Sequence, residues 1–119
     1  MATDKNDNIW IGTDGGIVKC KMDEKKKSIE IFSTANGLPD DIVRTILPDK
    51  KGNFWIGTHD GGVCYFDPYL KKVTNSFSNW DHGVVNALEI FEERELWIGT
   101  EGNGVFRLDF KKQEITPII

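Results

Sequence analysis

The chain has 119 residues, of which 39% are apolar and 29% are charged, and its formal net charge is −4. That length suits a single domain, and the balance of apolar and charged residues is typical of a folded protein. The negative charge argues against sequence-independent nucleic-acid binding, which needs basic side chains to neutralise phosphates. The polar residues 1–8 do not resemble a signal peptide, and no apolar run is long enough for direct insertion into a membrane.

The motif Trp-Ile-Gly-Thr occurs three times, at residues 10–13, 55–58 and 97–100, so that successive copies lie 45 and 42 residues apart. A glycine-containing turn follows each copy, and the segments beyond the turns are also similar to one another. Three copies with matched flanks indicate an internal repeat of roughly 40–45 residues, which is the length of one β-propeller blade.

The predicted elements follow this repeat in chain order. The first unit, residues 8–34, starts with the strand that contains Trp10 and lacks an obvious strand before it. The second unit, residues 41–78, is predicted to contain strands at 42–47, 54–58, 62–67 and 73–77. The third unit, residues 84–119, has the same order, and no segment has the period and caps of a helix. The sequence therefore predicts an all-β fold, a partial β-propeller of about three four-stranded antiparallel blades.

The alternation of side chains along a strand assigns roles to the repeated motif. Trp55 and Gly57 should share one face of their strand, and Ile56 and Thr58 the other. Each tryptophan is expected to be buried against a neighbouring blade, each glycine to permit close approach, and each threonine to begin the following turn. The structural repeat residues are therefore Trp10, Gly12, Thr13, Trp55, Gly57, Thr58, Trp97, Gly99 and Thr100. The alternative for the tryptophans is a platform on which a ligand stacks.

Further residues of the second unit extend the motif on both sides. They are Gly37-Leu38-Pro39, Asp49, Gly52-Asn53 and Gly61-Gly62. Together with residues 55–58 they resemble the two-component regulator propeller repeat, and the resemblance covers nearly the whole chain. The third copy departs from it, because "EERE" replaces the Asp-x-x-Gly-Asn turn. The resemblance implies a non-enzymatic, periplasmic sensor region of a bacterial hybrid histidine kinase that binds oligosaccharides.

Three blades are fewer than the roughly 4–8 of a closed propeller. Either the chain is an excerpt of a longer sensor, or copies of it associate blade against blade, in which case two copies would give six blades. The missing first strand of the first unit would come from a neighbouring copy or from the N-terminal residues 1–7. The expected partners are therefore other propeller blades or copies of this chain.

Blade topology places the turns between second and third strands on the same end of the stack as the connections between blades. In this sequence, those segments contain carboxylates and no lysine or arginine. Carboxylates beside an aromatic ring suit neutral sugars. The expected ligand-binding residues are His59, Asp60, Trp80, Asp81 and His82. The alternative is that they are solvated turn residues and that Trp80 packs beneath its connection.

The opposite end is rich in lysine, with Lys71-Lys72 and Lys111-Lys112 in the same turn of two units. These pairs either protect strand edges and aid solubility or form a docking surface for an acidic partner.

Residues suited to catalysis are scarce. The inner strands offer only Arg44 and Asn86, so a propeller lyase or hydrolase is a weaker alternative to a binding module, beside a purely structural fragment that assembles. The two histidines and nearby aspartates do not form a known metal-ligand pattern, and we expect no metal and no cofactor. Cys20 and Cys64 lie in apolar segments and are expected to be buried free thiols.

Overall fold

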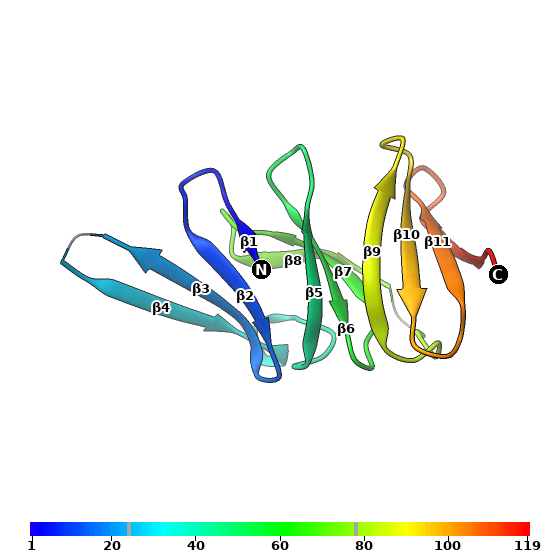
Figure 1. The fold of residues 1–119 in the computed structure, drawn as a ribbon, viewed down its shortest axis with the longest axis horizontal. Coiled ribbons are helices and arrows are strands. Elements are labelled where there is room, and N and C mark those ends of the chain that lie inside the picture. The colour runs from blue at the N-terminus through cyan, green and yellow to red at the C-terminus, as the bar shows by residue number, and fades with distance from the viewer. Residues whose placement is uncertain (24, 78) are drawn as a thin grey trace.

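Three separate four-stranded antiparallel sheets make up the fold, and each contains strands that are consecutive in the sequence (Figure 1). The structure is a computed structural model that describes residues 1–23, 25–77 and 79–119. Glu24 in the first predicted unit and Ser78 at the end of the second therefore lie outside the described residues. The predicted all-β partial propeller of three blades is confirmed.

Each sheet is one blade. Blade 1 contains β1 (Ala2–Thr3), β2 (Ile9–Thr13), β3 (Gly16–Met22) and β4 (Lys27–Phe32). Blade 2 contains β5 (Val43–Pro48), β6 (Phe54–Thr58), β7 (Val63–Asp67) and β8 (Lys72–Ser76). Blade 3 contains β9 (Val85–Phe91), β10 (Glu95–Thr100), β11 (Val105–Asp109) and β12 (Glu114–Pro117). β5 contacts both β1 and β9, so the first strands of the blades neighbour one another, as the inner strands of a propeller do.

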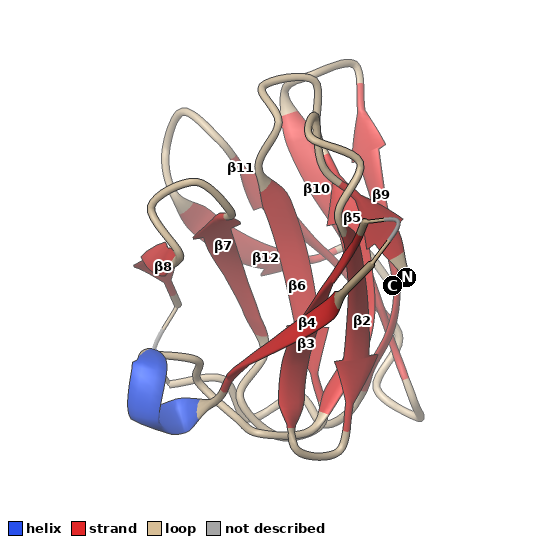
Figure 2. Ribbon diagram, turned by 90° about the vertical axis from the view of Figure 1, so that its left-hand side faces the viewer, coloured by secondary structure: helices blue, strands red, loops and turns tan. Residues whose placement is uncertain are grey.

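A short 3-10 helix, Thr34–Asn36, lies in the connection from blade 1 to blade 2 (Figure 2). Ser33 caps it: the Ser33 hydroxyl accepts a hydrogen bond from the backbone N–H of Ala35, and the Ser33 N–H donates to the Asn36 side chain. No helix among the described residues is both long and apolar enough to cross a membrane.

The N-terminal residues supply the first strand of blade 1. Ala2 pairs with Trp10 and Thr3 pairs with Ile9, so the first sheet begins ahead of residue 8, where the sequence pattern places the start of the first unit. The strand is only two residues long, which is too short for a side-chain alternation to be visible in the sequence.

The turn that follows this strand has the same architecture in blades 1 and 2. The Asp49 carboxylate accepts a hydrogen bond from the backbone N–H of Asn53 at 2.9 Å, and the Asp4 carboxylate accepts one from the N–H of Asn8 at 3.1 Å. In both turns the residue before the asparagine has a left-handed backbone conformation: Gly52, with φ of 89°, in blade 2, and Asp7, with φ of 62°, in blade 1. Residues 4–8, "DKNDN", are therefore a copy of "DKKGN" at 49–53, a match that the sequence analysis missed.

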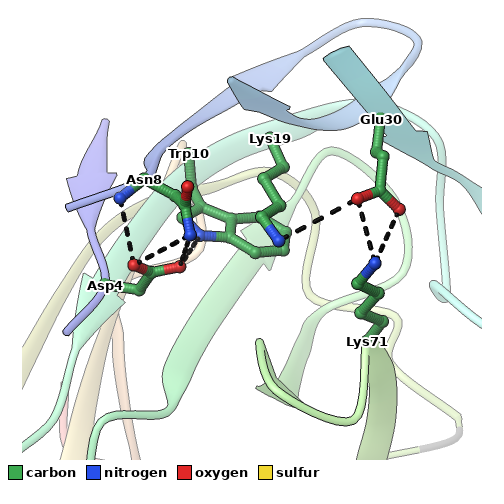
Figure 3. Close-up of polar contacts among 6 residues, drawn as sticks. All are labelled: Asp4, Asn8, Trp10, Lys19, Glu30 and Lys71. Atoms are coloured by element: carbon green, nitrogen blue, oxygen red, sulfur yellow. Dashed lines mark hydrogen bonds and ion pairs between the residues drawn. The ribbon is translucent and has the colours of Figure 1, made fainter. Parts of the chain in front are cut away.

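Trp10 is fixed by polar contacts around its buried ring (Figure 3). Its indole Nε1 donates a hydrogen bond to Asp4 Oδ2 at 2.9 Å, and Lys19 Nζ lies 5.7 Å from the ring centroid. On β4, the Glu30 carboxylate forms an ion pair with Lys71 of blade 2, with Lys71 Nζ and Glu30 Oε1 3.0 Å apart. Blade 1 is thus linked to blade 2 by this ion pair as well as by apolar packing.

Two clusters of apolar side chains hold the stack together, one between blades 1 and 2 and the other between blades 2 and 3. In the first, side chains of blade 1 pack against Phe54, Ile56, Cys64 and Phe66 of blade 2. In the second, Trp55 and Val63 of blade 2 pack against Val85, Leu96, Ile98, Phe106 and Leu108 of blade 3. Ile56 therefore faces blade 1 and Trp55 faces blade 3, which confirms the predicted alternation.

The motif glycines allow the next blade to approach closely. A Cβ added to Gly12 would lie 2.6 Å from Val43 Cγ1 in blade 2, and one added to Gly57 would lie 2.5 Å from Val85 Cγ1 in blade 3. Both distances are well inside van der Waals contact. A side chain at either position would therefore overlap the valine of the next blade unless that valine moved.

The motif threonines close the following turn in the same way in all three blades. The hydroxyls of Thr13, Thr58 and Thr100 donate to the carbonyls of Gly16, Gly62 and Gly104 at 2.9, 2.8 and 2.7 Å. Each hydroxyl also accepts a hydrogen bond from a backbone N–H inside the turn. The threonine is therefore a turn residue, as the sequence predicted, and its hydroxyl supplies an acceptor for a backbone N–H inside the turn.

Trp97 differs from the other two motif tryptophans. It is 37% exposed, and its Nε1 donates to Glu95 Oε1 on its own strand at 2.8 Å. The expectation that every motif tryptophan is buried between blades is correct for Trp10 and Trp55 and wrong for Trp97. The reason is that no further blade of the described chain covers this face of blade 3.

Candidate functional site

The predicted acidic end exists as a set of linked turns. Figure 1 shows the turns β2–β3, β6–β7 and β10–β11 at one end of the stack, together with the connection that leaves blade 1. Backbone hydrogen bonds tie these segments together: the N–H of His59 donates to the Ile42 carbonyl, and the N–H of Glu101 donates to the Val84 carbonyl, both at 2.9 Å.

Two of the carboxylates at this end hold the connection in place. Asp40 Oδ2 accepts a hydrogen bond from the backbone N–H of Asp60 at 2.6 Å, which joins the blade connection to the β6–β7 turn. Asp41 Oδ1 accepts one from the N–H of Thr34, at the start of the 3-10 helix, at 2.8 Å. Because each accepts a backbone hydrogen bond, Asp40 and Asp41 have a clear structural role.

Trp80 lies half-buried between blades 2 and 3. Its Nε1 donates to the Gly83 carbonyl at 2.7 Å, and its ring meets those of His82 and Phe106 edge-on. The ring also covers Gly62, where an added Cβ would lie 2.7 Å from Trp80 Cγ. Trp80 therefore packs beneath the connection, as the alternative interpretation of the sequence had it, and fixes the position of the residues around it.

Two adjoining hollows flank Trp80. One, of about 350 Å³, is lined by Asp60 with Ser76, Phe77 and Asn79. The other, of about 390 Å³, is lined by His82 together with the same three residues. Phe77 and Trp80 supply an apolar surface, whereas the carboxylate, hydroxyl and amide supply hydrogen-bonding groups. Three of the five predicted binding residues, Asp60, Trp80 and His82, thus surround one region.

The other two predicted residues lie at its margin. Asp81 lines neither hollow, and its side chain is 84% exposed, with Oδ1 at 3.2 Å from His82 Nδ1. His59 lines neither hollow and is half-buried at the start of its turn. His82 is held by a stacked contact with Phe106, with ring centroids 4.1 Å apart, and its carbonyl accepts a hydrogen bond from Asn103.

A third hollow, of about 370 Å³, lies between blades 2 and 3 and is lined by Trp55, Phe110, Asp49 and Lys50 among others. The hydroxyl of Tyr65 donates to Asp49 and accepts from Asn53 Nδ2. Partial burial and the hydrogen bond to the carboxylate raise the pKa of Tyr65 to about 12, so the hydroxyl stays protonated. The sequence analysis missed this tyrosine, although it lies directly across from Trp55 in the strand pairing.

The groups considered for other chemistry are dispersed. Among the described residues, no three His, Cys, Asp or Glu side chains lie together in a way that would hold a metal ion. Arg44 and Asn86 are both exposed. Cys64 is buried, and burial raises the pKa of its thiol to about 12. Cys20 is only half-buried, contrary to expectation, because it lies on the outward face of blade 1.

The lysine pairs occupy equivalent turns but not equivalent positions. Lys71 and Gln113 are the matching left-handed residues of these turns, with φ of 57° and 56°. Each reaches back to the fourth strand of the preceding blade, where Lys71 binds Glu30 and Gln113 binds Asn75. One lysine of the first pair therefore links two blades.

Comparison with known proteins supports the same architecture. Residues 37–60 match the family described as "Two component regulator propeller". This segment runs from the connection before blade 2 to the β6–β7 turn, and so contains the second copy of the Trp-Ile-Gly-Thr motif. No curated protein sequence matches the chain.

Solved structures with a similar fold include extracellular domains of two-component systems from B. thetaiotaomicron. One is the extracellular domain of the hybrid two-component system BT3049, which is 29% identical in sequence and superposes with a TM-score of 0.75. The match covers 97% of this chain and 16% of that domain's chain. The corresponding domain of BT4673 is 20% identical, with a TM-score of 0.78, over 99% of this chain and 18% of that one, a likeness that concerns the fold alone. The propeller repeats of this chain are thus related to extracellular regions of hybrid two-component systems and span less than a fifth of their length.

Proposed function

We propose that the chain is part of a periplasmic, ligand-sensing region of a hybrid two-component signalling protein, and that it contributes to binding a neutral oligosaccharide. The propeller repeat and the similar solved structures support the sensor assignment. The two hollows beside Trp80 carry the ligand assignment, because they combine an apolar floor with hydrogen-bonding groups at one end of the stack.

The chemistry of these hollows matches that of a sugar. A saccharide presents apolar C–H groups on the faces of its rings and hydroxyls around their edges. The aromatic side chains Phe77 and Trp80 would pack against the ring faces, and the Asp60 carboxylate would accept hydrogen bonds from hydroxyls. Asn79 and Ser76 add groups that both donate and accept. An anionic ligand is disfavoured here by the exposed carboxylates of Asp60 and Asp81.

Binding without chemical conversion is the proposed activity. The side chains around the hollows supply hydrogen-bond acceptors and aromatic surfaces, whereas covalent catalysis requires a nucleophile in hydrogen-bonding reach of a base. In the proposed role, the ligand state of this end of the stack is passed to the signalling part of the protein through the packed blades.

Calorimetric titration of the chain with a panel of neutral oligosaccharides tests the proposal. The double variant Asp60→Asn with Asp81→Asn keeps the shape of both side chains and removes their charges. We expect it to weaken binding by roughly tenfold or more, since hydrogen bonds to charged groups contribute about 1.5–3 kcal/mol. Asp14→Asn is the matched control, because Asp14 is an exposed carboxylate in the equivalent turn of blade 1.

Two results would contradict the proposal. One is equal binding by the double variant and the unmodified chain. The other is the absence of binding heat with every oligosaccharide in the panel.

A further inference from the structure

A row of charged side chains lies beside the motif tryptophan in the interface between blades 1 and 2 (Figure 3). Lys19 pairs across the strands with Trp10, and its Nζ lies 5.7 Å from the ring centroid. Glu30 pairs with Lys19 on the next strand, and its Oε1 lies 3.9 Å from Lys19 Nζ and 3.0 Å from Lys71 Nζ of blade 2. Two ammonium groups and the carboxylate between them therefore occupy the space beside Trp10, which is fully buried.

The matching row between blades 2 and 3 is uncharged, and a hollow takes the place of the ion pairs. Here Tyr65 pairs with Trp55, and Asn75 pairs with Tyr65. Gln113 of blade 3 stands where Lys71 stands in the other interface, with the same left-handed backbone conformation. A phenol and two carboxamides therefore replace two ammonium groups and a carboxylate. The third hollow, of about 370 Å³, opens at this point, and all of its lining residues belong to blades 2 and 3.

Apolar side chains form one part of this hollow. The rings of Trp55 and Phe110 are stacked, with centroids 5.4 Å apart and planes 4° from parallel. Ile90 of blade 3 also lines the hollow. Because Trp55 is held by the packing between the two blades, these side chains form a fixed apolar surface against which a ring of a ligand can pack.

The two carboxamides hold each other in place and keep hydrogen-bonding capacity for a ligand. Asn75 Nδ2 donates to Gln113 Oε1 at 2.5 Å, and Gln113 Nε2 donates to the Phe110 carbonyl at 2.7 Å. A carboxamide has one acceptor oxygen and two N–H donors. Within the described part of the chain, the Asn75 oxygen and one N–H of each carboxamide therefore remain for a ligand.

The charged groups around the hollow favour an anion. Asp49 is committed to its own turn, because its carboxylate accepts hydrogen bonds from the backbone N–H of Lys51 at 2.9 Å and from the Tyr65 hydroxyl. Lys50 Nζ lies 3.6 Å from Glu93 Oε1 of blade 3. Lys51 has no ion-pair partner among the described residues. One ammonium group is therefore free for an anionic ligand, and a second is shared with a carboxylate that such a ligand can displace.

We propose that the hollow between blades 2 and 3 binds a small ring-bearing carboxylate. The ring packs on the apolar surface, the carboxamides bind its substituents, and the carboxylate binds Lys50 and Lys51. The volume is at the lower end of the roughly 300–1,000 Å³ of small-molecule sites, which suits a ligand with one ring. A uronic acid and an aromatic acid share this chemistry. The hollow lies at the end that carries the β5–β6 and β9–β10 turns, opposite the β6–β7 and β10–β11 turns (Figure 1), so this site is separate from the proposed site for a neutral oligosaccharide.

NMR spectra of the isotopically labelled chain test the proposal and locate the site. The probes are sodium glucuronate and sodium benzoate, with glucose and benzamide as their uncharged counterparts at the same ionic strength. The signals of the Trp55 indole N–H and of the Asn75 and Gln113 carboxamides should shift with at least one of the two acids and not with the counterparts. The Trp80 indole signal, which reports on the other site, should stay in place. A response to glucuronate alone identifies a saccharide ligand, and a response to benzoate alone identifies an aromatic acid.

Substitutions in exposed turns test the roles of the charges without disturbing the core. Lys50→Gln with Lys51→Gln removes both ammonium groups and should weaken binding roughly fivefold or more, with an unchanged circular dichroism spectrum. Lys111→Gln with Lys112→Gln is the matched control, because it removes the same charge from the same end and neither lysine lines the hollow. Glu93→Gln should strengthen binding, because it releases Lys50 from its ion pair.

Three results would overturn the proposal. One is the absence of shifts at Trp55, Asn75 and Gln113 with both acids. Another is an equal response to the acids and to their uncharged counterparts. The third is a loss of affinity that is no greater for the Lys50 and Lys51 double variant than for its control, since that pattern indicates attraction to the overall charge of this end and not binding in the hollow.

Discussion

Adding one methyl group to the motif glycine of each repeat tests how the blades pack. At Gly57 the new Cβ would lie 2.5 Å from Val85 Cγ1 and 2.7 Å from Thr45 Cγ2. Carbon atoms normally rest about 3.5–4.0 Å apart, so the overlap is roughly 1 Å on two sides. At Gly12 the nearest atoms are Val43 Cγ1 at 2.6 Å and the Val43 carbonyl oxygen at 3.2 Å. At Gly99 the nearest atom is Ala87 Cβ at 3.4 Å.

These distances set the expected changes in the free energy of unfolding. Gly12→Ala and Gly57→Ala should each lower it by about 1–3 kcal/mol, the usual cost of overpacking. Gly99→Ala should leave it unchanged or raise it by up to about 1 kcal/mol, because alanine reduces the conformational freedom of the unfolded chain. Urea unfolding followed by circular dichroism measures all three, at a concentration where light scattering detects single chains. If Gly99→Ala were as costly as Gly57→Ala, the glycine would be required within a blade and the explanation by blade approach would be refuted.

Three further changes have defined expectations. Glu92 and Glu93 form a tight turn with φ of 50° and 56°, so Glu92→Asn with Glu93→Gly should raise the free energy of unfolding by about 1–2 kcal/mol, measured by urea unfolding. Trp80→Ala should lower it by about 2 kcal/mol or more, because the ring packs on Gly62 and Phe106; an unchanged thermal melt would mean that Trp80 serves only a ligand. Partial burial alone would raise the pKa of Asp4, but hydrogen bonds from Trp10, Asn8 and Asn6 outweigh it and hold this pKa below its ordinary value of 3.8. Asp4 therefore stabilises the fold above about pH 4, and this contribution is lost as pH falls through its folded pKa, so Asp4→Asn should lose less stability between pH 6 and pH 3 than the unmodified chain.

The blade architecture was predictable because the repeated motif has a fixed place in it. Trp55 and Gly57 alternate with Ile56 along one strand, and a strand with both faces apolar has to lie between two neighbours. The exposure of Trp97 was not predictable from its own sequence environment, which matches that of Trp10. It depends on whether another blade follows in the stack.

The candidate site was less predictable because it is made of turns. Turn residues have no period, and their direction depends on single left-handed positions such as Asn79 (φ 64°), Gly62 (φ 74°) and Gly83 (φ 83°). The acidic character of this end followed from topology, and so did the neighbourhood of Asp60, Trp80 and His82. The marginal places of His59 and Asp81, and the structural use of Asp40 and Asp41, required coordinates.

The opposite faces of each blade have a consequence for how such chains grow during evolution. Every unit carries both halves of the contact, with tryptophan and glycine on one side and other apolar side chains on the other. A tandem duplication of one unit therefore inserts a new blade whose two surfaces already fit their neighbours, without compensating changes elsewhere. The same polarity gives the array a beginning and an end, so a duplicated unit can be accommodated in only one orientation.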